Sequence, residues 1–344
     1  MLKDFMTSMP IPYLLREKGS LDCCRNSFPY HGYVYIMKEN ILFIGGAGFI
    51  GSNIIKGLVN NKNYQIFVME PAYADISRLQ NIPIKVFRGT ISDMDNLASI
   101  LKTNNISKVV HLVSTMVPGC GYDEYKLEFE NVIFPTVRLM QYCSRNGILF
   151  IYFSSGGTVY GERKTLVPFV ETDPMKPISY YGLSKQMIED CIQFEHRISG
   201  LQYIILRPSN PYGPGQKSDG RQGLIAVALD KALAGKPITV WGDGSAIRDY
   251  IYIDDLVYAF CQLLGKKIVN ETLNIGSGEG ISVNQILRIV SDVIGEDVEV
   301  EHTPSRKSDV SNMILDNTKL KSIVDINFTP IVQGVRNSLK PLRR

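Results

Sequence analysis

The sequence contains few residues of the kinds that bind metal ions or form disulfide frameworks. Its 344 residues include six cysteines and four histidines. The histidines lie far apart and the cysteines lack the paired spacing of metal sites, so no metal site is predicted. We expect reduced, buried thiols and therefore a cytoplasmic protein. The cysteines are Cys23, Cys24, Cys120, Cys143, Cys191 and Cys261.

The sequence also lacks a long apolar run and an excess of charge of one sign. No run reaches the ~18 apolar residues that a membrane span needs, and Asp4 and Pro10 interrupt any signal-peptide pattern. The 37 Lys and Arg residues nearly balance the 34 Asp and Glu residues, and no basic run is dense enough to indicate nucleic acid. Hydrophobic residues make up 44% and charged residues 21%, as is typical of a soluble globular enzyme. Neither a membrane nor a nucleic acid is an expected partner.

The most informative stretch is ILFIGGAGFIG. Its first four residues, 41–44, are apolar and predict a buried strand that the glycines end abruptly. Gly45, Gly48 and Gly51 follow at intervals of three, a spacing typical of dinucleotide-binding turns, in which the backbone turns tightly and approaches a pyrophosphate. The helix expected from Phe49 would direct its free N–H groups at the phosphates. A plain glycine-rich turn is the alternative.

The next predicted strand ends in an acidic residue. A helix over 49–59 precedes an apolar strand over 65–69, which Glu70 follows. Glu70 lies 19 residues after Gly51, close to the ~20 at which a carboxylate accepts hydrogen bonds from ribose hydroxyls. Because a carboxylate repels a 2′-phosphate, Glu70 favours NAD over NADP. A solvated glutamate at a strand end is the alternative.

Strands and helices alternate through much of the chain. Further strands are expected over 84–87, 108–113, 149–153 and 203–206, and helices over 93–101, 123–144 and 181–198. This alternation predicts an α/β fold with a Rossmann-type, doubly wound parallel sheet that helices cover on both faces. Ligands then bind beyond the C-terminal strand ends. Pro135 should kink the helix in which it lies.

The composition predicts three parts of the chain. Residues 1–36 show no sustained period, and we expect a dispensable arm, although its tyrosines could pair as an extra edge strand. Residues 37–207 would hold the dinucleotide-binding sheet. Residues 208–344 have long Gly- and Pro-containing loops and would form mainly a smaller C-terminal lobe for substrate, with some segments returning to the sheet. A less certain strand is expected near Ile251.

A tyrosine and a lysine in YGLSK have the spacing of a catalytic pair. Tyr181 and Lys185 lie one helical turn apart, so both project from one face of the helix. An unperturbed phenol has a pKa near ~10, too high for a base at neutral pH. The ammonium of Lys185, or an oxidised nicotinamide, would lower that pKa. Tyr181 could then take a hydroxyl proton while hydride leaves the same carbon.

Several motifs occur together in one order. They are GGAGFIG at 45–51, HLVS at 111–114, ENV at 130–132, SSGGTVYG at 154–161, YGLSK at 181–185 and LRPSNPYGPGQ at 206–216. With Glu70, they resemble the extended short-chain dehydrogenase/reductase superfamily over roughly residues 38–330, and most closely its nucleotide-sugar epimerase/dehydratase branch, which is like UDP-glucose 4-epimerase. The resemblance implies NAD held by Gly45, Gly48, Phe49, Ile50, Gly51, Glu70, Asn131, Tyr181 and Lys185.

The chain departs from this family at a catalytic position. The family's Ser or Thr, third in its strand-end run, is Gly156 here. A hydroxyl is needed near the sugar oxygen to orient it and to shorten the proton path. Thr158 is our first candidate for this duty and Ser155 the second. The alternative is that both residues only cap a strand end.

Substrate contacts are expected from the second lobe. The resemblance matches Asn210 with the residue that meets the nucleotide-sugar, and Arg248 and Arg306 with diphosphate-binding arginines. Asp309 follows Arg306 at the family spacing. A guanidinium suits two phosphate oxygens at once. The resemblance also places Met313 beside the C2 substituent of the sugar, where a flexible side chain would favour plain hexoses over N-acetylhexosamines.

The resemblance implies an NAD-dependent epimerase of a nucleotide diphosphate sugar, acting at C4 of a UDP-hexose through a transient 4-keto sugar. A dehydratase, decarboxylase or reductase of the same superfamily is the alternative, although dehydratases carry an Asp-Glu pair where this chain has Gly157 and Thr158. A non-catalytic NAD-sensing protein is a third option, which the intact Tyr181 and Lys185 disfavour. Relatives pair through two helices, here 123–144 and 181–198, so a homodimer is expected.

Overall fold

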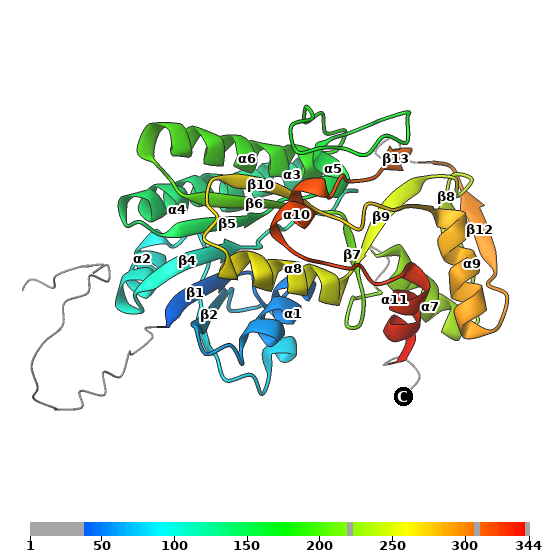
Figure 1. Ribbon diagram of the computed structural model, residues 1–344, viewed down its shortest axis with the longest axis horizontal. Helices are drawn as coiled ribbons and strands as arrows, with labels where there is room; N and C mark the ends of the chain where they lie inside the picture. The colour runs from blue at the N-terminus through cyan, green and yellow to red at the C-terminus, as the bar shows by residue number, and fades with distance from the viewer. Residues whose placement is uncertain (1–37, 219–222, 306–309, 341–344) are drawn as a thin grey trace, which may run out of the picture. The chain divides into compact units, whose positions relative to one another are not determined.

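A seven-stranded parallel sheet forms the centre of a computed structural model, which describes residues 38–218, 223–305 and 310–340 (Figure 1). The strands lie in the order β10-β6-β5-β4-β1-β2-β3. They are β1 (Glu39–Ile44), β2 (Tyr64–Glu70), β3 (Lys85–Arg88), β4 (Ile106–His111), β5 (Leu149–Phe153), β6 (Tyr203–Pro208) and β10 (Glu271–Ile275). The order reverses between β1 and β4, where doubly wound sheets bind ligands. The predicted fold class is therefore confirmed, while the arm 1–36 lies outside the described residues.

Helices cover both faces of this sheet (Figure 1). On one face, α1 (Phe49–Leu58), α8 (Ile253–Gly265) and α10 (Thr318–Ile323) pack apolar side chains against β1, β2 and β4. On the other face lie α2 (Met94–Thr103), α4 (Phe134–Arg145) and α6 (Tyr180–Ser199). Residues 41–44 are at most 2% exposed, because the strand that they form is covered from both sides.

The long helix expected over 123–144 is divided into three segments. These are α3 (Tyr122–Glu128), a π-helical segment (Phe129–Ile133) and α4. Pro135 lies in the first turn of α4, where its missing N–H is tolerated, and the widened π turn comes directly before it. The irregularity that we expected at the proline is thus a change of helix type next to it.

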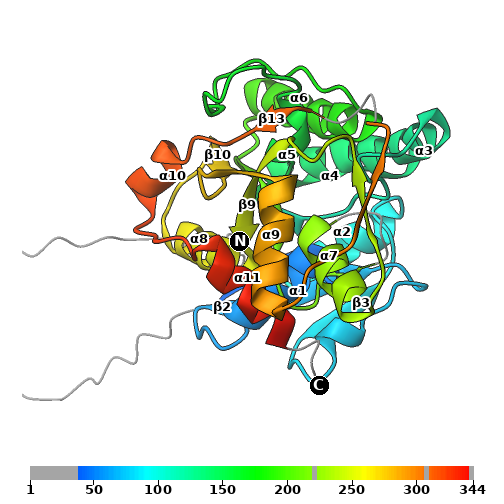
Figure 2. The same cartoon turned by 90° about the vertical axis from the view of Figure 1, so that its right-hand side faces the viewer.

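The C-terminal part of the chain builds two smaller sheets. One contains β11 (Gly280–Ser282), β9 (Ile247–Tyr252) and β13 (Asn312–Met313), with β7 (Asn210–Tyr212) also on β9; the other pairs β8 (Ile238–Trp241) with β12 (Val300–Thr303). Three helices pack together beside them, α7 (Leu224–Leu233), α9 (Val283–Ile294) and α11 (Ile331–Leu339) (Figure 2).

Two strands from beyond residue 207 differ from their expected places. The strand predicted near Ile251 is β9, which belongs to a small sheet and not to the large one. Conversely, β10 pairs with β6 at the edge of the large sheet. The boundary at residue 207 stays a prediction.

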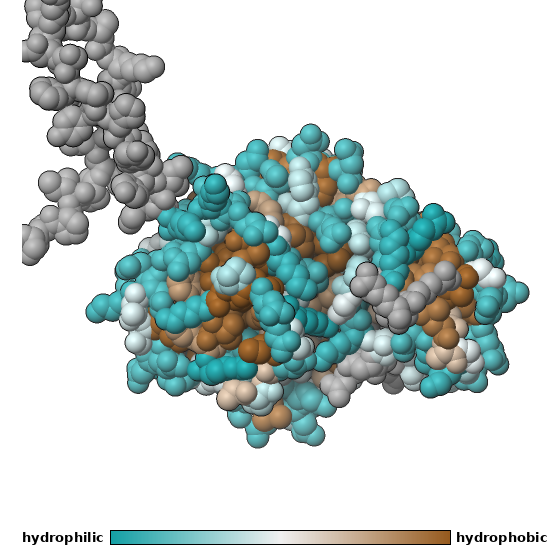
Figure 3. Space-filling model, turned by 90° about the horizontal axis from the view of Figure 1, so that it is seen from below, coloured by the Kyte–Doolittle hydropathy of each residue, from teal (hydrophilic) through white to brown (hydrophobic). Residues whose placement is uncertain are grey.

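The surface of the described chain mixes polar and apolar residues. Figure 3 shows one face, on which hydrophobic side chains are exposed between hydrophilic ones. Within the described ranges, no helix is both long enough and apolar enough to cross a membrane.

Candidate active site

A cavity of about 620 Å³ lies at the C-terminal end of the large sheet. It brings together residues of the strand-end motif after β5, the start of α6, the loop after β6, and β8 and β9. The predicted site residues that line it are Ile50, Ser155, Thr158, Tyr181, Asn210 and Arg248. Side chains from distant parts of the sequence therefore share one space, as the motifs indicated.

Tyr181 lies in the first turn of α6, which Ser179 caps by accepting a hydrogen bond from the Gly182 N–H. Burial raises the pKa of Tyr181 to about 12, although its side-chain hydrogen bond with Ser155 opposes this rise. The sequence led us to expect a lowered pKa. The difference arises because desolvation of the phenolate outweighs any effect of Lys185, whose Nζ lies 5.6 Å from the centroid of the Tyr181 ring.

Lys185 lies one turn further along α6 and is only 4% exposed. Its Nζ donates to the Phe153 carbonyl oxygen at 3.1 Å and lies 5.1 Å from the centroid of the Tyr152 ring. Burial lowers the pKa of Lys185 to about 8, and the charges of two carboxylates act in the opposite direction. The ammonium therefore lies close to its titration range at neutral pH.

The strand-end motif has no room for the family's hydroxyl at its usual place. A Cβ on Gly156 would lie 2.6 Å from Leu315 Cδ1 and 2.9 Å from the Arg207 carbonyl oxygen. Ser155 and Thr158 both line the cavity, and Ser155 is the one that is hydrogen-bonded to Tyr181. The buried Thr158 Oγ1 has no partner in the described structure.

Further hydroxyls near the cavity are also unsatisfied. Ser154 and Ser209 line it, and the Oγ of each is buried without a hydrogen-bond partner among the described residues. Buried polar groups are nearly always paired in native proteins. With Thr158, these hydroxyls indicate a space that a polar ligand fills.

The glycine-rich turn has the shape that a dinucleotide requires. Gly45 has φ +79°, and a Cβ on Gly51 would lie 2.7 Å from the Gly46 carbonyl oxygen, so α1 packs closely on the turn. A Cβ on the exposed Gly48 would meet only Gly45 O, at 3.6 Å, so this glycine leaves room for a ligand. Gly48 supplies no side-chain cap to α1, whose first N–H groups remain available for phosphate.

Glu70 ends β2 beside this turn. It is 6% exposed, and its Oε1 accepts a hydrogen bond from the Ala47 N–H at 2.5 Å. Burial raises the pKa of Glu70, whereas that hydrogen bond and the charge of Arg88 lower it. The residues of the turn and Glu70 therefore fit a dinucleotide.

The expected substrate residues have different places. Asn210 Nδ2 donates to the Asp249 carbonyl oxygen at 2.8 Å, and Arg248 Nη1 donates to the Ile247 carbonyl oxygen at 2.9 Å. Met313 is 1% exposed and packs in an apolar cluster, outside the set of described residues that line the cavity. Its Cε would lie 3.6 Å from a Cβ on Gly157, which does line the cavity. Met313 thus lies behind the wall.

Three expected residues are not placed at the cavity. Arg306 and Asp309 lie outside the described residues. Asn131 is in the π-helical segment, and its exposed side chain donates to the Leu127 carbonyl oxygen at 2.9 Å. Its expected contact with the cofactor stays a prediction.

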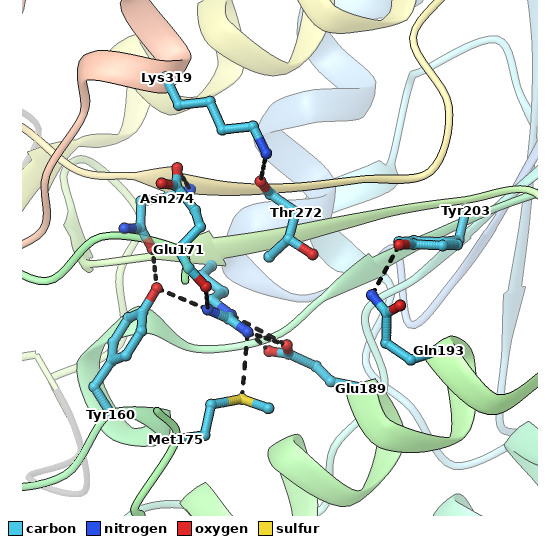
Figure 4. Close-up of polar contacts among 10 residues, drawn as sticks. Tyr160, Glu171, Met175, Glu189, Gln193, Tyr203, Thr272, Asn274 and Lys319 are labelled. Carbon is cyan, nitrogen blue, oxygen red and sulfur yellow. Dashed lines mark hydrogen bonds and ion pairs between the residues drawn. The ribbon is translucent and has the colours of Figure 1, made fainter. Parts of the chain in front are cut away.

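The sequence did not reveal a buried polar network behind α6. Arg207 Nη2 lies 2.6 Å from Glu189 Oε2, and Arg207 Nη1 donates to the Tyr160 hydroxyl at 2.8 Å. Tyr160 in turn donates to Asn274 Oδ1 at 2.6 Å. Figure 4 shows Tyr160, Glu189 and Asn274 pointing toward one another from different elements.

Glu128 is another buried group that the sequence analysis missed. It is 1% exposed and interacts electrostatically with Tyr181 and Lys185. Neighbouring charges in KLEFEN made it resemble an ordinary solvated helix face. No signal in one sequence separates it from them.

The glycine-rich turn at the switch point of a parallel sheet, with Tyr181 and Lys185 beside a polar cavity, defines a dinucleotide-binding protein of the short-chain dehydrogenase/reductase type. The chain belongs to the NAD dependent epimerase/dehydratase family, whose model matches residues 41–276. The resemblance drawn from the motifs is confirmed.

Individual relatives are similar over most of their length. The chain is 31% identical to a dTDP-4-dehydro-6-deoxyglucose reductase of Escherichia coli, covering 89% of this chain and 98% of that protein. It is 29% identical to a UDP-glucose 4-epimerase of Lactobacillus helveticus, covering 83% and 90%. The crystal structure of Thermotoga maritima UDP-glucose 4-epimerase with UDP-glucose matches with a TM-score of 0.82 and 32% identity, covering 88% and 98%.

Proposed function

We propose that this protein is an NAD-dependent epimerase that inverts C4 of a nucleotide diphosphate hexose, with UDP as the nucleotide, through a transient 4-keto sugar. The observation that carries the proposal is the shared cavity, which Tyr181, Ser155, Asn210 and Arg248 line together. An acid/base group and a phosphate-binding group at opposite parts of one site suit a substrate that carries both a reacting hydroxyl and a diphosphate.

Tyr181 accepts the proton of the C4 hydroxyl and later returns it. The chemistry that NAD supplies when bound is reversible acceptance of hydride from C4. Because burial holds the pKa of Tyr181 near 12, the protein must favour the phenolate by a nearby positive charge, and Lys185 provides one. Ser155, already hydrogen-bonded to Tyr181, orients the sugar oxygen, and Thr158 offers a second hydroxyl.

The cofactor is held by backbone groups and by two side chains. The N–H groups at the start of α1, from Gly48, Phe49 and Ile50, face its phosphates, and Glu70 binds the adenosine ribose. Gly45 and Gly51 allow the turn and its close packing on α1. Lys185 binds the nicotinamide ribose.

The substrate is held mainly from the C-terminal lobe. Arg248 binds the diphosphate, together with Arg306 and Asp309. Asn210 contacts the sugar side of the substrate. Met313 lies behind Gly157 and limits the space there, so it acts on C2 selectivity through this glycine.

A reductase of the same superfamily is the second candidate, because the Escherichia coli relative is named as one and is covered almost completely. Both reactions need the same pair of residues in α6. They differ in whether the hydride returns to the substrate from which it came.

We propose a homodimer formed through α3, α4 and α6. Large apolar side chains on these helices are exposed, and dimerisation would cover them. They are Tyr122, Leu127, Phe134, Tyr180, Phe194 and Ile198. Light scattering after size exclusion should give twice the monomer mass, and Phe194→Glu should reduce it to the monomer.

A panel of UDP-, GDP- and dTDP-hexoses with NAD tests the function. The products are separated by chromatography and analysed by mass spectrometry and NMR. An epimerase gives unchanged mass with inverted C4. Loss of water, loss of carbon dioxide or a gain of two hydrogens would instead assign the protein as a dehydratase, decarboxylase or reductase.

A further inference from the structure

Glu128 is a buried carboxylate that the proposed mechanism leaves unused. It ends α3 and is 1% exposed. Its Oε1 accepts from Ser114 Oγ at 2.9 Å, and its Oε2 accepts from the N–H and the Oγ1 of Thr115 at 2.9 and 2.5 Å. All three donors are neutral. Because a buried charge is unfavourable without a partner of opposite sign, a cation is expected close by.

The face of α3 that carries Glu128 packs on α6. Tyr125, three residues before Glu128 and on the same helix face, stacks on Tyr180 with ring centroids 5.1 Å apart. The Tyr125 hydroxyl donates to Met187 Sδ at 2.9 Å. Tyr180 and Met187 flank the Tyr–Lys pair of α6. Glu128 therefore lies on the side of α3 that faces this pair.

The titratable groups around Lys185 come from four elements. They are Tyr181 and Glu189 on α6, His111 on β4, Tyr152 on β5 and Glu128 on α3. The two tyrosines are neutral at physiological pH, because burial raises the pKa of each. His111 is neutral as well, because burial and the charge of Lys185 lower its pKa to about 3.

The two carboxylates near Lys185 differ in their partners. Arg207 binds Glu189 with Nε and Nη2, so the charge of Glu189 is already balanced. Among the described residues, Glu128 is then the carboxylate beside Lys185 whose hydrogen-bond donors are all neutral.

We propose that Glu128 is a positioning residue that supplies the buried counter-charge of Lys185 and fixes the β4–α3 loop against α6. The inference rests on the proposed roles of Tyr181 and Lys185. Glu128 keeps Lys185 protonated, and the ammonium then favours the Tyr181 phenolate. The same carboxylate holds Ser114 and Thr115, and this loop continues to Pro118 in the cavity wall.

Direct titration of Lys185 tests the inference without substrate or cofactor. The protein is labelled with ¹³C at lysine Cε, and the Lys185 resonance is assigned by its loss in Lys185→Met. The wild-type pKa should lie near 8. In Glu128→Gln it should fall by about one unit or more, as is typical when an opposite charge nearby is removed. An unchanged Lys185 pKa in the folded variant overturns the proposal.

A matched control separates this effect from the loss of any buried carboxylate. Glu195, also on α6, is 2% exposed and hydrogen-bonds to Gln141 and Ser199 near the far end of the helix. Glu195→Gln should leave the Lys185 pKa unchanged. Glu128→Met is a second neutral variant, and Glu128→Asp retains the charge. If both neutral variants fail to fold while Glu128→Asp folds, the carboxylate serves the fold alone and the proposal is wrong.

The pH dependence of turnover gives the second readout. Protonated Lys185 is lost as pH rises through its pKa, so the basic limb of kcat should move to lower pH in Glu128→Gln, with KM changed less than kcat. A lower kcat with an unmoved limb contradicts the proposal. Because the NMR titration needs no activity, an error in the assigned reaction would leave its result valid.

Discussion

The two sides of α6 treat their buried polar groups in opposite ways. Behind the helix, Arg207 and Glu189 form an ion pair whose side chains are 6% and 2% exposed, and Tyr160 and Asn274 extend the hydrogen-bond network. At the cavity, the hydroxyls of Ser154, Thr158 and Ser209 are buried without partners in the described structure. The network is complete without a ligand, whereas the cavity is not.

This difference separates residues that hold the fold from residues that await a substrate. A satisfied buried network is worth keeping rigid, since removing one member leaves another unpaired. An unsatisfied group has a cost that a ligand can remove. Substitutions behind α6 should therefore change stability more than chemistry, and substitutions at the cavity should do the reverse.

Tyr181→Phe should have the largest effect on the cavity side. It removes the proton acceptor and keeps the ring, so kcat should fall by about 100- to 10,000-fold, as is typical of lost acid/base catalysis. The melting temperature should change little. Steady-state kinetics and thermal melts of the same preparation check both statements, and near-normal epimerisation would refute the assigned role.

Arg207→Met should have the largest effect behind the helix. It leaves the Glu189 carboxylate buried without its partner, which typically costs about 3–5 kcal/mol of unfolding free energy. Urea titration measures this loss. The double variant Arg207→Met with Glu189→Met should recover much of it, because no charge then remains unpaired. A single variant as stable as the wild type would contradict the comparison.

The two hydroxyl candidates should differ by less. Ser155 is hydrogen-bonded to Tyr181, so Ser155→Ala should slow turnover by roughly tenfold or more. Thr158→Val should be milder and should not reduce stability, since its hydroxyl has no partner in the described structure. This order reverses the one expected from sequence. Single-turnover kinetics on the matched pair ranks the two, and the opposite ranking would restore Thr158.

The smallest effect concerns His111, which is 0% exposed and lies 2.9 Å from Thr136 through its Nε2. Its folded pKa near 3 is below the ordinary 6.5. Between these values the unfolded chain binds the extra proton, so stability is full above pH 6.5 and falls by up to about 1.4 kcal/mol per pH unit below it. His111→Gln should show a shallower loss between pH 6.5 and 5 in urea titrations. An equal slope would exclude His111 as the cause.

Sequence patterns predicted the regular parts of the fold well. The strand expected over 149–153 has the bounds of β5, and the apolar runs before Gly45 and Glu70 lie within β1 and β2. Their side chains are buried on both faces, so composition alone identifies them. The strand expected over 108–113 begins at Ile106 and ends at His111, since strand ends depend on pairing with neighbours.

The missed features depend on tertiary contacts. The pKa of Tyr181 is set by burial, which one sequence does not measure. The place of Met313 behind Gly157 and the steric limit on Gly156 arise where β13 and its neighbours meet the strand-end motif. Glu128 and Arg207 are charged residues in helix and strand patterns, and only packing shows them to be buried.

The central claim is that hydride leaves C4 and returns to the same carbon while the cofactor is regenerated. A nucleotide-hexose with deuterium at C4 tests it most directly. After equilibration with catalytic NAD, the account predicts both C4 epimers with deuterium retained at C4 and no accumulation of NADH. Stoichiometric NADH, or loss of deuterium from C4, would contradict the account.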